Sequence, residues 1–336
     1  MITRLQDYNL RTANTFRLDA RCDEWIEYTS AEDLPAIRAI IGDRRYMNIG
    51  QGANLLFADD FRGIVLQSKI LDVEITPDGS DALLARVGAG VSMDAFIAQC
   101  ASQSVWGLEN LSGIPGHAGA SAVQNVGAYG VEAGDRIVCV EAYDMTIGEY
   151  VEFGHDDCRF AYRDSIFKHE RNRYVITYVT YRLSTVPAPV LDYGHLRKSL
   201  SEDCILSPMA VRDAVLAMRS AKLPEVDEIG SAGSFFKNPV VSEAKFAELR
   251  RQSDTDVPHY RVGEDYKIPA AWLIDQCGLK GYSIGGAKVW ELQPLIIVNA
   301  SGRATAAEIL AVEAHVLRQV RDTYGIELQP EVDHIY

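Results

Sequence analysis

A serine set between a glycine and two aromatic residues stands out in this chain of 336 residues. It is Ser234, in the run Gly230-Ser-Ala-Gly-Ser-Phe-Phe-Lys-Asn-Pro239, which is typical of a tight turn that presents a hydroxyl. Ser234 and Lys237 also fit S-x-x-K, the spacing of nucleophile and base in penicillin-recognising acyl enzymes. The companion motifs S-D-N and K-T-G are absent, and Pro239 would end the helix that should follow the lysine. The sequence therefore disfavours acyl transfer at Ser234 without naming another role.

Two other side chains are candidates for an interaction with a charged group of a ligand. Arg163, in the segment Cys158–Lys168, can bind a carboxylate or a phosphate through two parallel hydrogen bonds. Taken alone, it is better explained by an ordinary ion pair with Asp164 or another acid. Glu331 follows Pro330 close to the C-terminus, and an exposed surface glutamate is its default interpretation.

The segment Asn48–Phe57 contains a glycine turn after an apolar strand. Gly50 and Gly52 expose backbone N–H groups that can cradle a phosphate, although a plain β-turn explains the segment more simply. It does not match the dinucleotide fingerprint G-x-G-x-x-G, because Leu55 occupies the last glycine position. Gly88-Ala-Gly90 fails the same test, since Met93 stands there. A classical NAD-binding fold therefore gains little support.

The segment Gly107–Gly130 holds six glycines, interspersed with alanine and serine and with few charges. Small residues allow the backbone to approach a large, flat ligand, and a loop this long in a compact domain is usually functional. A turn followed by a helix of small residues is the alternative. We favour the ligand, because glycine in a helix costs stability.

Capping residues and apolar spacing predict the elements that position these segments. Five helices are expected to begin after Ser30, Ser92, Ser207, Ser242 and Thr305. Six strands are expected in segments rich in β-branched and aromatic residues: Arg45–Ile49, Gly63–Leu66, Leu83–Val87, Arg136–Tyr143, Tyr174–Leu183 and Leu295–Asn299. Since no regular βα repeat links them, the pattern favours an α+β fold. Pro187-Ala-Pro189 and Leu223–Gly230 are predicted joints, the second one opening a separate domain at about residue 222.

Composition excludes several classes of protein. The net charge is −14 and Lys and Arg form no runs, which disfavours a nucleic-acid or anionic-membrane surface. No signal peptide or membrane-spanning apolar stretch is visible. The six cysteines are scattered without a C-x-x-C pair, so we expect reduced thiols, no metal site and a cytoplasmic protein.

Taken together, these segments resemble the UDP-N-acetylenolpyruvoylglucosamine reductases of bacterial cell-wall synthesis. The matching segments follow one another in the family's order along nearly the whole chain. It is carried by Asn14–Phe16, Gly50–Phe57, Gly107–Asn110, Ile114–Gly116, Gln124–Gly130, Tyr162–Lys168, Ala232–Pro239, Trp272–Asp275 and Pro330–Val332. The segment Leu191–Leu196 and the loop containing Tyr260 resemble the longer, type I form of the family.

The resemblance implies an α+β fold with a two-part FAD-binding domain of the vanillyl-alcohol-oxidase/p-cresol-methylhydroxylase type and a separate α+β substrate-binding domain. The implied boundaries are 1–65 and 66–221 for the two FAD-binding parts and 222–324 for the substrate-binding domain, with 325–336 returning to the first part or to the site. FAD is expected to bind non-covalently. The implied cofactor-binding residues are Gly50, Gly52, Ala53, Asn54, Leu55, Ile114, Pro115, Gly116, Ser121 and Gly127. His117 and Ala118 depart from the family pattern at this point.

The resemblance also implies a reaction. NADPH reduces the flavin, which then delivers hydride to the enolpyruvyl β-carbon of UDP-N-acetylglucosamine enolpyruvate and yields UDP-N-acetylmuramate for peptidoglycan synthesis. Arg163 and Glu331 match the residues beside the resulting enolate, and Ser234 matches the donor that protonates the α-carbon. For Glu331 to assist, it must be protonated or hydrogen-bonded to the intermediate, which requires a raised pKa.

The substrate's diphosphate, sugar and uracil require local contacts in this acidic chain. The matching positions are Tyr193, Lys222, Asn238, Tyr260 and Gln293. Lys267 and Arg219 are either extra cations or plain surface residues. We expect a monomer without nucleic-acid or membrane partners. An FAD-dependent oxidase or dehydrogenase of the same fold, acting on another substrate, is the alternative function.

Overall fold

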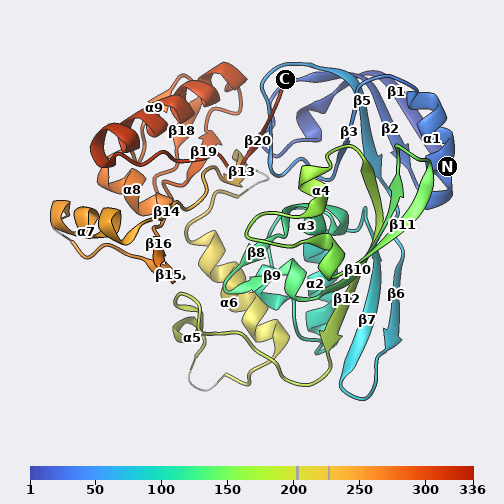
Figure 1. Cartoon of the computed structure of the whole chain (residues 1–336), viewed down its shortest axis with the longest axis horizontal. Coiled ribbons are helices and arrows are strands. Elements are labelled where there is room, and N and C mark those ends of the chain that lie inside the picture. Colours follow the sequence, from blue (N-terminus) through green and yellow to red (C-terminus); the bar gives the residue numbers. More distant parts are fainter. Residues whose placement is uncertain (202–203, 226–227, 254) are drawn as a thin grey trace. The chain divides into compact units, whose positions relative to one another are not determined.

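The computed structural model describes residues 1–336 except 202–203, 226–227 and 254 (Figure 1). The chain forms two compact units, each assembled from separate stretches. The first unit contains Met1–Tyr8, Cys22–Gln51 and Arg62–Ser220, and the second contains Asn9–Arg21, Gly52–Phe61 and Ala221–Tyr336. Part of the predicted joint Leu223–Gly230, residues 226–227, lies outside the described residues.

A four-stranded sheet forms one part of the first unit. Its order is β1 (Ile2–Asn9), β2 (Arg21–Tyr28), β5 (Phe61–Ser68) and β3 (Tyr46–Ile49), with β3 and β5 parallel. Helix α1 (Leu34–Ile41) contributes Leu34, Ile37 and Ile41 to the core against this sheet. Ser30 and Asp33 form the predicted capping box ahead of α1.

An unusual buried carboxylate lies in strand β2. Glu24 is 1% exposed and pairs with Arg4 and with Arg44, the latter at 2.8 Å. Burial alone would raise the pKa of Glu24, but the hydrogen bonds from the two arginines outweigh it and lower the pKa.

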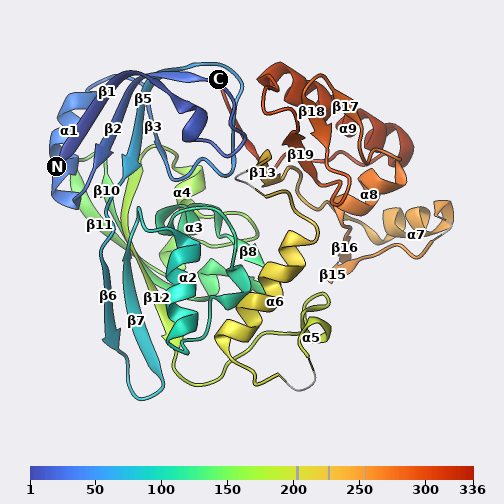
Figure 2. The ribbon, with the colours of Figure 1, turned by 180° about the vertical axis from the view of Figure 1, so that it is seen from behind.

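A second, five-stranded antiparallel sheet completes the first unit. Its order is β11 (Glu149–Gly154), β10 (Ile137–Asp144), β12 (Tyr174–Ser184), β7 (Ala82–Gly88) and β6 (Val73–Pro77). Helices α2 (Met93–Ser102) and α3 (Ala118–Gln124) cover one face of it, as Figure 2 shows, and α6 (Pro208–Ser220) packs against α2. Met93 and Phe96 of α2 share a core with Ala85 and Val87 of β7, which fixes the helix to the sheet.

The second unit is built around a four-stranded sheet and a long helix. The sheet order is β13 (Gly230–Ser234), β19 (Ile296–Asn299), β18 (Ala287–Val289) and β17 (Ser283–Ile284). Helix α9 (Ala306–Tyr324) packs on β17, β18 and β19 through Ile309, Val312, Val316 and Val320. Its ends are fixed by the predicted Thr305–Glu308 capping box and by Gly325 in the left-handed region.

Smaller elements of the second unit carry predicted site residues. Strands β14 (Val240–Val241), β16 (Asp265–Lys267) and β15 (Tyr260–Val262) form an antiparallel sheet beside α7 (Glu243–Gln252), and α8 (Ala270–Gln276) follows. Strand β4 (Leu55–Phe57) pairs in parallel with β20 (Asp333–Ile335) at the C-terminus. The chain end is thereby tied to the segment that follows Gly52.

The five predicted helices and six predicted strands are all present, and the α+β fold class is confirmed. The expected turn at Ser234 is replaced by the end of strand β13, where the pairing with β19 is interrupted between Ser231 and Ser234 and Gly233 has a φ of +69°. Part of Gly107–Gly130 is helical, since α3 lies within it, so the turn–helix alternative describes that stretch correctly. Across the described residues, every helix is too short or too polar to span a bilayer.

Candidate functional site

In the first unit, Gly50 is brought against the glycine-rich segment Gly107–Gly130. The carbonyl of Gly50, just after β3, accepts a hydrogen bond from Gln67 Nε2 at 2.7 Å. A Cβ atom on Gly50 would lie 3.3 Å from the Cβ of Ala120 in α3. The turn therefore packs against the first part of α3 with little space for a side chain.

His117 lies at the start of α3, beside Gly50. Burial lowers the pKa of His117 to about 4, and the nearby Lys69 adds to this effect, so the imidazole is neutral near pH 7. The residue that departs from the family pattern therefore adds no charge to this loop.

Ser121 faces the protein interior. Its hydroxyl is hydrogen-bonded to Tyr181 Oη on β12 and to the carbonyl of Ala118, both at 2.7 Å. Its side chain fastens α3 to the sheet, and its part in cofactor binding stays a prediction, as it does for Ile114, Pro115 and Gly116.

Arg163 is fixed at the far end of the same glycine-rich segment. Its Nη2 donates to the carbonyl of Gly127 at 2.6 Å, and a Cβ on Gly127 would lie 2.9 Å from its Nη1. Lys168 Nζ bonds to the carbonyl of Arg163 at 3.3 Å and to Gln124 Oε1 at 2.8 Å. Asp164, the acid suggested as a partner, instead contacts His169 at 2.8 Å. The guanidinium is thus held in one place by its neighbours.

Two buried polar atoms near this segment have no hydrogen-bond partner among the described residues: Gln124 Nε2 and Asn110 Oδ1. The other amide ends are occupied, since Asn110 Nδ2 donates to the carbonyls of Tyr129 and Val190, both at 2.8 Å. A buried donor and a buried acceptor without partners require an explanation, and a polar ligand supplies one.

Arg219, at the end of α6, is a cation that the sequence left undecided. Its Nη2 donates to the carbonyl of Gly113 at 2.9 Å, and none of the described residues forms a carboxylate ion pair with it. Burial lowers its pKa, while Tyr129 and Asp94 nearby oppose that effect. It is therefore a partly buried positive charge beside the glycine-rich segment and not a solvated surface residue.

Ser234 and Glu331 lie on hydrogen-bonded segments of the second unit. The Glu331 N–H donates to the carbonyl of Phe235 and the Lys237 N–H donates to that of Gln329, both at 2.8 Å. Phe235 is buried, whereas Ser234 is exposed. The backbone of Glu331 is thereby held next to the residue that follows Ser234.

The second unit also holds Gly52, Ala53, Asn54 and Leu55. Gly52 has a φ of +64°, and a Cβ there would lie 2.2 Å from the carbonyl oxygen of Ala13, so only glycine fits. Asn54 Nδ2 donates to the carbonyl of Glu331 at 3.1 Å, and Leu55 begins β4. The predicted cofactor residues therefore fall in both units.

The predicted substrate residues are spread over several elements. Tyr193 of the first unit is 43% exposed, and its Cβ lies 3.0 Å from where a Cβ on Gly130 would stand. Asn238 Oδ1 accepts from the N–H of Ala270 at 2.9 Å, which fixes the start of α8 and leaves its amide group to donate elsewhere. Tyr260 pairs with Lys267 across β15 and β16.

Lys222 and Gln293 complete this set in the second unit. Lys222 is exposed, and its carbonyl accepts a hydrogen bond from Trp290 Nε1 at 3.0 Å. Gln293 is partly buried and accepts at its own carbonyl from the N–H of Ile296 at 3.0 Å. In both residues these contacts use the backbone and fix the chain rather than the polar end of the side chain.

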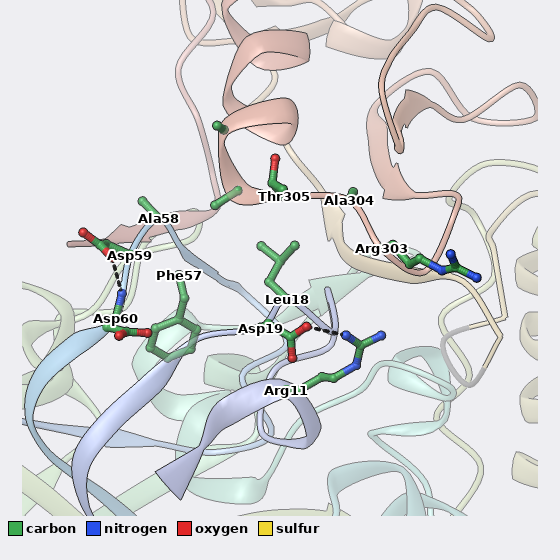
Figure 3. A pocket seen from close by; sticks show the side chains of 12 residues that line it. Arg11, Leu18, Asp19, Phe57, Ala58, Asp59, Asp60, Arg303, Ala304 and Thr305 are labelled. Carbon is green, nitrogen blue, oxygen red and sulfur yellow. Dashed lines mark hydrogen bonds and ion pairs between the residues drawn. The ribbon is translucent and has the colours of Figure 1, made fainter. Parts of the chain in front are cut away.

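A cavity of about 550 Å³ lies elsewhere in the second unit, at the start of α9 (Figure 3). Its lining mixes Arg11 and Arg303 with Asp19, Asp59 and Asp60, and Arg11 pairs with Asp19 at 2.7 Å. None of the predicted site residues lines it. We assign it no part in the reaction.

Comparison with known proteins identifies the family. The chain is 43% identical to a UDP-N-acetylenolpyruvoylglucosamine reductase of Bacteroides fragilis, with 98% of this chain and 99% of the relative covered. A reductase of the same description from Porphyromonas gingivalis is 42% identical, with 98% of each chain covered. The chain belongs to the UDP-N-acetylenolpyruvoylglucosamine reductase family. It is therefore an FAD-dependent oxidoreductase, as expected.

Domain and structure matches agree with this family. Residues 25–154 match an FAD binding domain, and residues 224–335 match the C-terminal domain of UDP-N-acetylenolpyruvoylglucosamine reductase. The crystal structure of the reductase from Thermus caldophilus superposes with a TM-score of 0.67 at 22% identity, covering 100% of this chain and 99% of that one. The predicted combination of a vanillyl-alcohol-oxidase-type FAD-binding domain and a separate C-terminal α+β domain is confirmed. The three sets of boundaries predicted from sequence remain a proposal.

The residues of the first unit fit the family's flavin. The turn at Gly50 and the segment Ile114–Gly130 present backbone and small side chains, which a flat ring and a pyrophosphate need for close approach. The unpartnered Gln124 Nε2 and Asn110 Oδ1 offer one donor and one acceptor, and Arg219 offers positive charge. Sequence reasoning did not assign Gln124 and Asn110 a role, although both belong to segments that carry the family resemblance.

Proposed function

We propose that this chain catalyses the NADPH-dependent reduction of UDP-N-acetylglucosamine enolpyruvate to UDP-N-acetylmuramate, a step of peptidoglycan precursor synthesis. The observation that carries this proposal is the backbone pairing of the Ser234 and Glu331 segments, since it holds a residue with a hydroxyl and a residue with a carboxyl group on neighbouring segments of the chain. Bound FAD, once reduced by NADPH, supplies hydride to the enolpyruvyl β-carbon. Cytoplasmic localisation belongs to the same proposal, because nucleotide sugars and NADPH are made there.

In this proposal Arg163 stabilises negative charge on the substrate. Hydride addition places charge on the α-carbon and on the adjoining carboxylate, and a preorganised guanidinium lowers the energy of that enolate. The bonds from Arg163 to Gly127 and from Lys168 to Arg163 support this role, because a charge fixed beforehand needs no reorganisation during the reaction. Glu331 acts on the same intermediate as a hydrogen-bonding group.

Ser234 then protonates the α-carbon. Its hydroxyl has no hydrogen-bond partner among the described residues, and its side chain is exposed, so it is available to a bound ligand. Serine is a weak acid, and donation therefore requires that the nearby charges strengthen it while the enolate accepts the proton.

Tyr193, Lys222, Asn238, Tyr260 and Gln293 are proposed to hold the substrate. The amide group of Asn238 and the ammonium group of Lys222 are donors suited to a diphosphate. They concentrate positive and polar groups in a chain whose net charge is −14.

The test is NADPH oxidation by the purified flavoprotein with and without UDP-N-acetylglucosamine enolpyruvate. We expect oxidation to accelerate at least tenfold with the substrate, and mass spectrometry to detect a product heavier by two hydrogen atoms. Oxidation that is indifferent to this substrate would refute the proposal and favour an FAD-dependent oxidase or dehydrogenase acting on another compound.

A further inference from the structure

The last residues of the chain run beside the Ser234 segment. Phe236 and Pro330 form an isolated antiparallel bridge, flanked by the hydrogen bonds from Glu331 N–H to the Phe235 carbonyl and from Lys237 N–H to the Gln329 carbonyl. The position of Glu331 relative to Ser234 is therefore set by these backbone contacts, together with the hydrogen bond that Asn54 Nδ2 donates to the Glu331 carbonyl at 3.1 Å. A slip of one residue would turn the Glu331 side chain to the opposite face.

A short strand pair and the buried side chain of Val332 hold the residues that follow Glu331. Strand β20 spans only Asp333–Ile335 and pairs in parallel with the equally short β4. At the two ends of this pairing, backbone bonds run from Asp333 N–H to the Asn54 carbonyl at 2.9 Å and from Ala58 N–H to the Ile335 carbonyl at 2.8 Å. Two short strands are weak by themselves, and chain ends fray unless a further contact ties them down.

A largely buried side-chain pair supplies such a contact. His334 Nε2 lies 3.0 Å from Glu313 Oε2 on α9, and the two side chains are only 20% and 7% exposed. Glu313 stands on the otherwise apolar face of α9, near Val312 and Val316, and no described residue other than His334 pairs with its carboxylate. A carboxylate in such a place is costly to bury unless it is paired, so this ion pair specifies where β20 docks.

The imidazole also contacts the Ser234 segment. Its ring centroid lies 6.1 Å from that of Phe235, the buried residue directly after Ser234. His334 therefore links α9, the C-terminal strand and the segment that carries the serine. Glu331 is three residues before His334, just ahead of the strand so held.

We propose that the Glu313–His334 ion pair is a positioning element that keeps Glu331 aligned with Ser234. This inference deepens the proposed function and rests on the roles given there to Glu331 and Ser234. Neither member of the pair needs to contact the substrate.

The Glu313–His334 pair makes the positioning of Glu331 depend on pH. The hydrogen bond to Glu313 raises the pKa of His334, burial opposes it, and the charges of Glu313 and Asp333 add to the increase. Phe235, packed against the ring, carries no charge. A group with a raised folded-state pKa stabilises fully below its unfolded pKa of about 6.5, and that contribution is lost as the pH rises through the folded pKa. The alignment of Glu331 with Ser234 is thus held best at mildly acidic pH and weakens at alkaline pH.

The experiment compares the flavin-loaded wild type with Glu313→Gln, His334→Gln and the double variant. Stopped-flow absorbance measures flavin reduction by NADPH and flavin reoxidation by the enolpyruvyl substrate separately, from pH 5.5 to 8.5. We expect reduction to stay within about twofold of wild type, and reoxidation to slow about tenfold in each single variant and no further in the double variant. The alkaline fall in the wild-type reoxidation rate should disappear in His334→Gln.

The matched control is His315→Gln, which removes a histidine of α9 itself. His315 stacks on Tyr282, with ring centroids 4.0 Å apart, and is not the partner of Glu313. Reoxidation should be unchanged in this variant. Equal slowing of both half-reactions, or slowing in the control as well, would show a general loss of structure and overturn the positioning role.

Amide hydrogen exchange provides a readout that does not depend on turnover. The amides of Glu331, Asp333 and Ala58 should exchange at least tenfold faster in both single variants, while those of α2 keep their protection. Unchanged exchange at the three amides would overturn the inference. A wild type that does not reduce the enolpyruvyl substrate would refute the proposed function, and the exchange measurement would still decide whether the pair holds the two segments.

Discussion

Replacing Ser234 by alanine separates catalysis from stability. The serine is exposed and its hydroxyl has no hydrogen-bond partner among the described residues, so the change should alter the free energy of unfolding by less than about 0.5 kcal/mol. Loss of a positioned proton donor, in contrast, typically slows a reaction 10²- to 10⁴-fold, which corresponds to an activation free energy higher by about 3–5 kcal/mol. Unfolding cannot account for a loss of that size.

The assay follows the two half-reactions of Ser234→Ala by stopped-flow absorbance. Flavin reduction by NADPH should match the wild type within about twofold, because Ser234 takes no part in it. Reoxidation by the enolpyruvyl substrate should slow by the factor given above. Exposed Ser283, in strand β17 of the same sheet, provides the control variant Ser283→Ala, which should leave both rates unchanged. Equal losses in both half-reactions, or normal reoxidation in Ser234→Ala, would refute the proton-donor assignment.

Three further variants test other parts of the site and the fold. Arg163→Lys keeps the charge but loses the planar fork that bonds to the glycine-rich segment, so kcat should fall about 10- to 100-fold with intact flavin binding, as steady-state kinetics and flavin absorbance would show. Lys222→Ala removes an exposed cation proposed for the diphosphate, and should raise KM about tenfold while kcat stays within about twofold; a fall confined to kcat would contradict the binding role. Glu24→Gln should lower the thermal unfolding midpoint by about 2–4 °C at pH 7. Because the folded-state pKa of Glu24 is lowered, its contribution is present above the unfolded pKa and lost as the pH falls through the folded value, so mutant and wild-type midpoints should converge in acid.

Helix starts were predictable because their signals are local. The side chains of Ser92, Ser242 and Thr305 accept hydrogen bonds from N–H groups three residues ahead, as the sequence indicated. Strand β2 gave no such signal. Its apolar alternation is interrupted by Glu24, a charged residue that is buried only because Arg4 and Arg44 reach it from other elements. A sequence pattern cannot show which charge will find partners across the fold.

The composition of the two units also lay beyond the sequence pattern. Asn9–Arg21 and Gly52–Phe61 belong to the same compact unit as the C-terminal third of the chain, and β4 pairs with β20 from the far end. No joint in the sequence marks the points where the chain passes from one unit to the other, because the units depend on contacts between residues hundreds of positions apart. The resemblance located the segments that match the family, but not the reason for Gly52, which is the close approach of the Ala13 carbonyl.

Among the site residues, Arg219 shows the same limit most clearly. The sequence did not show whether Arg219 is a plain surface residue or an extra cation of the site. Its partial burial against Gly113, without a carboxylate partner among the described residues, emerges only when α6 packs beside the glycine-rich segment. An unpaired buried cation is costly in the absence of a ligand, which makes Arg219 a candidate for contact with an anionic group.

The backbone around Ser234 bears on the acyl-transfer chemistry that the sequence disfavours. S-x-x-K chemistry needs a helical turn, which places serine and lysine on one face. Here Ser234 ends strand β13, and the chain continues extended, with the Phe235 N–H bonded to the Leu295 carbonyl and the Lys237 N–H to that of Gln329. Residues three apart on an extended chain point to opposite faces, so Lys237 is not positioned to take a proton from Ser234. The same pairing that turns Lys237 away from Ser234 brings the backbone of Glu331 beside Phe235. It therefore supports a role for Ser234 as a proton donor to a ligand over a role as a nucleophile.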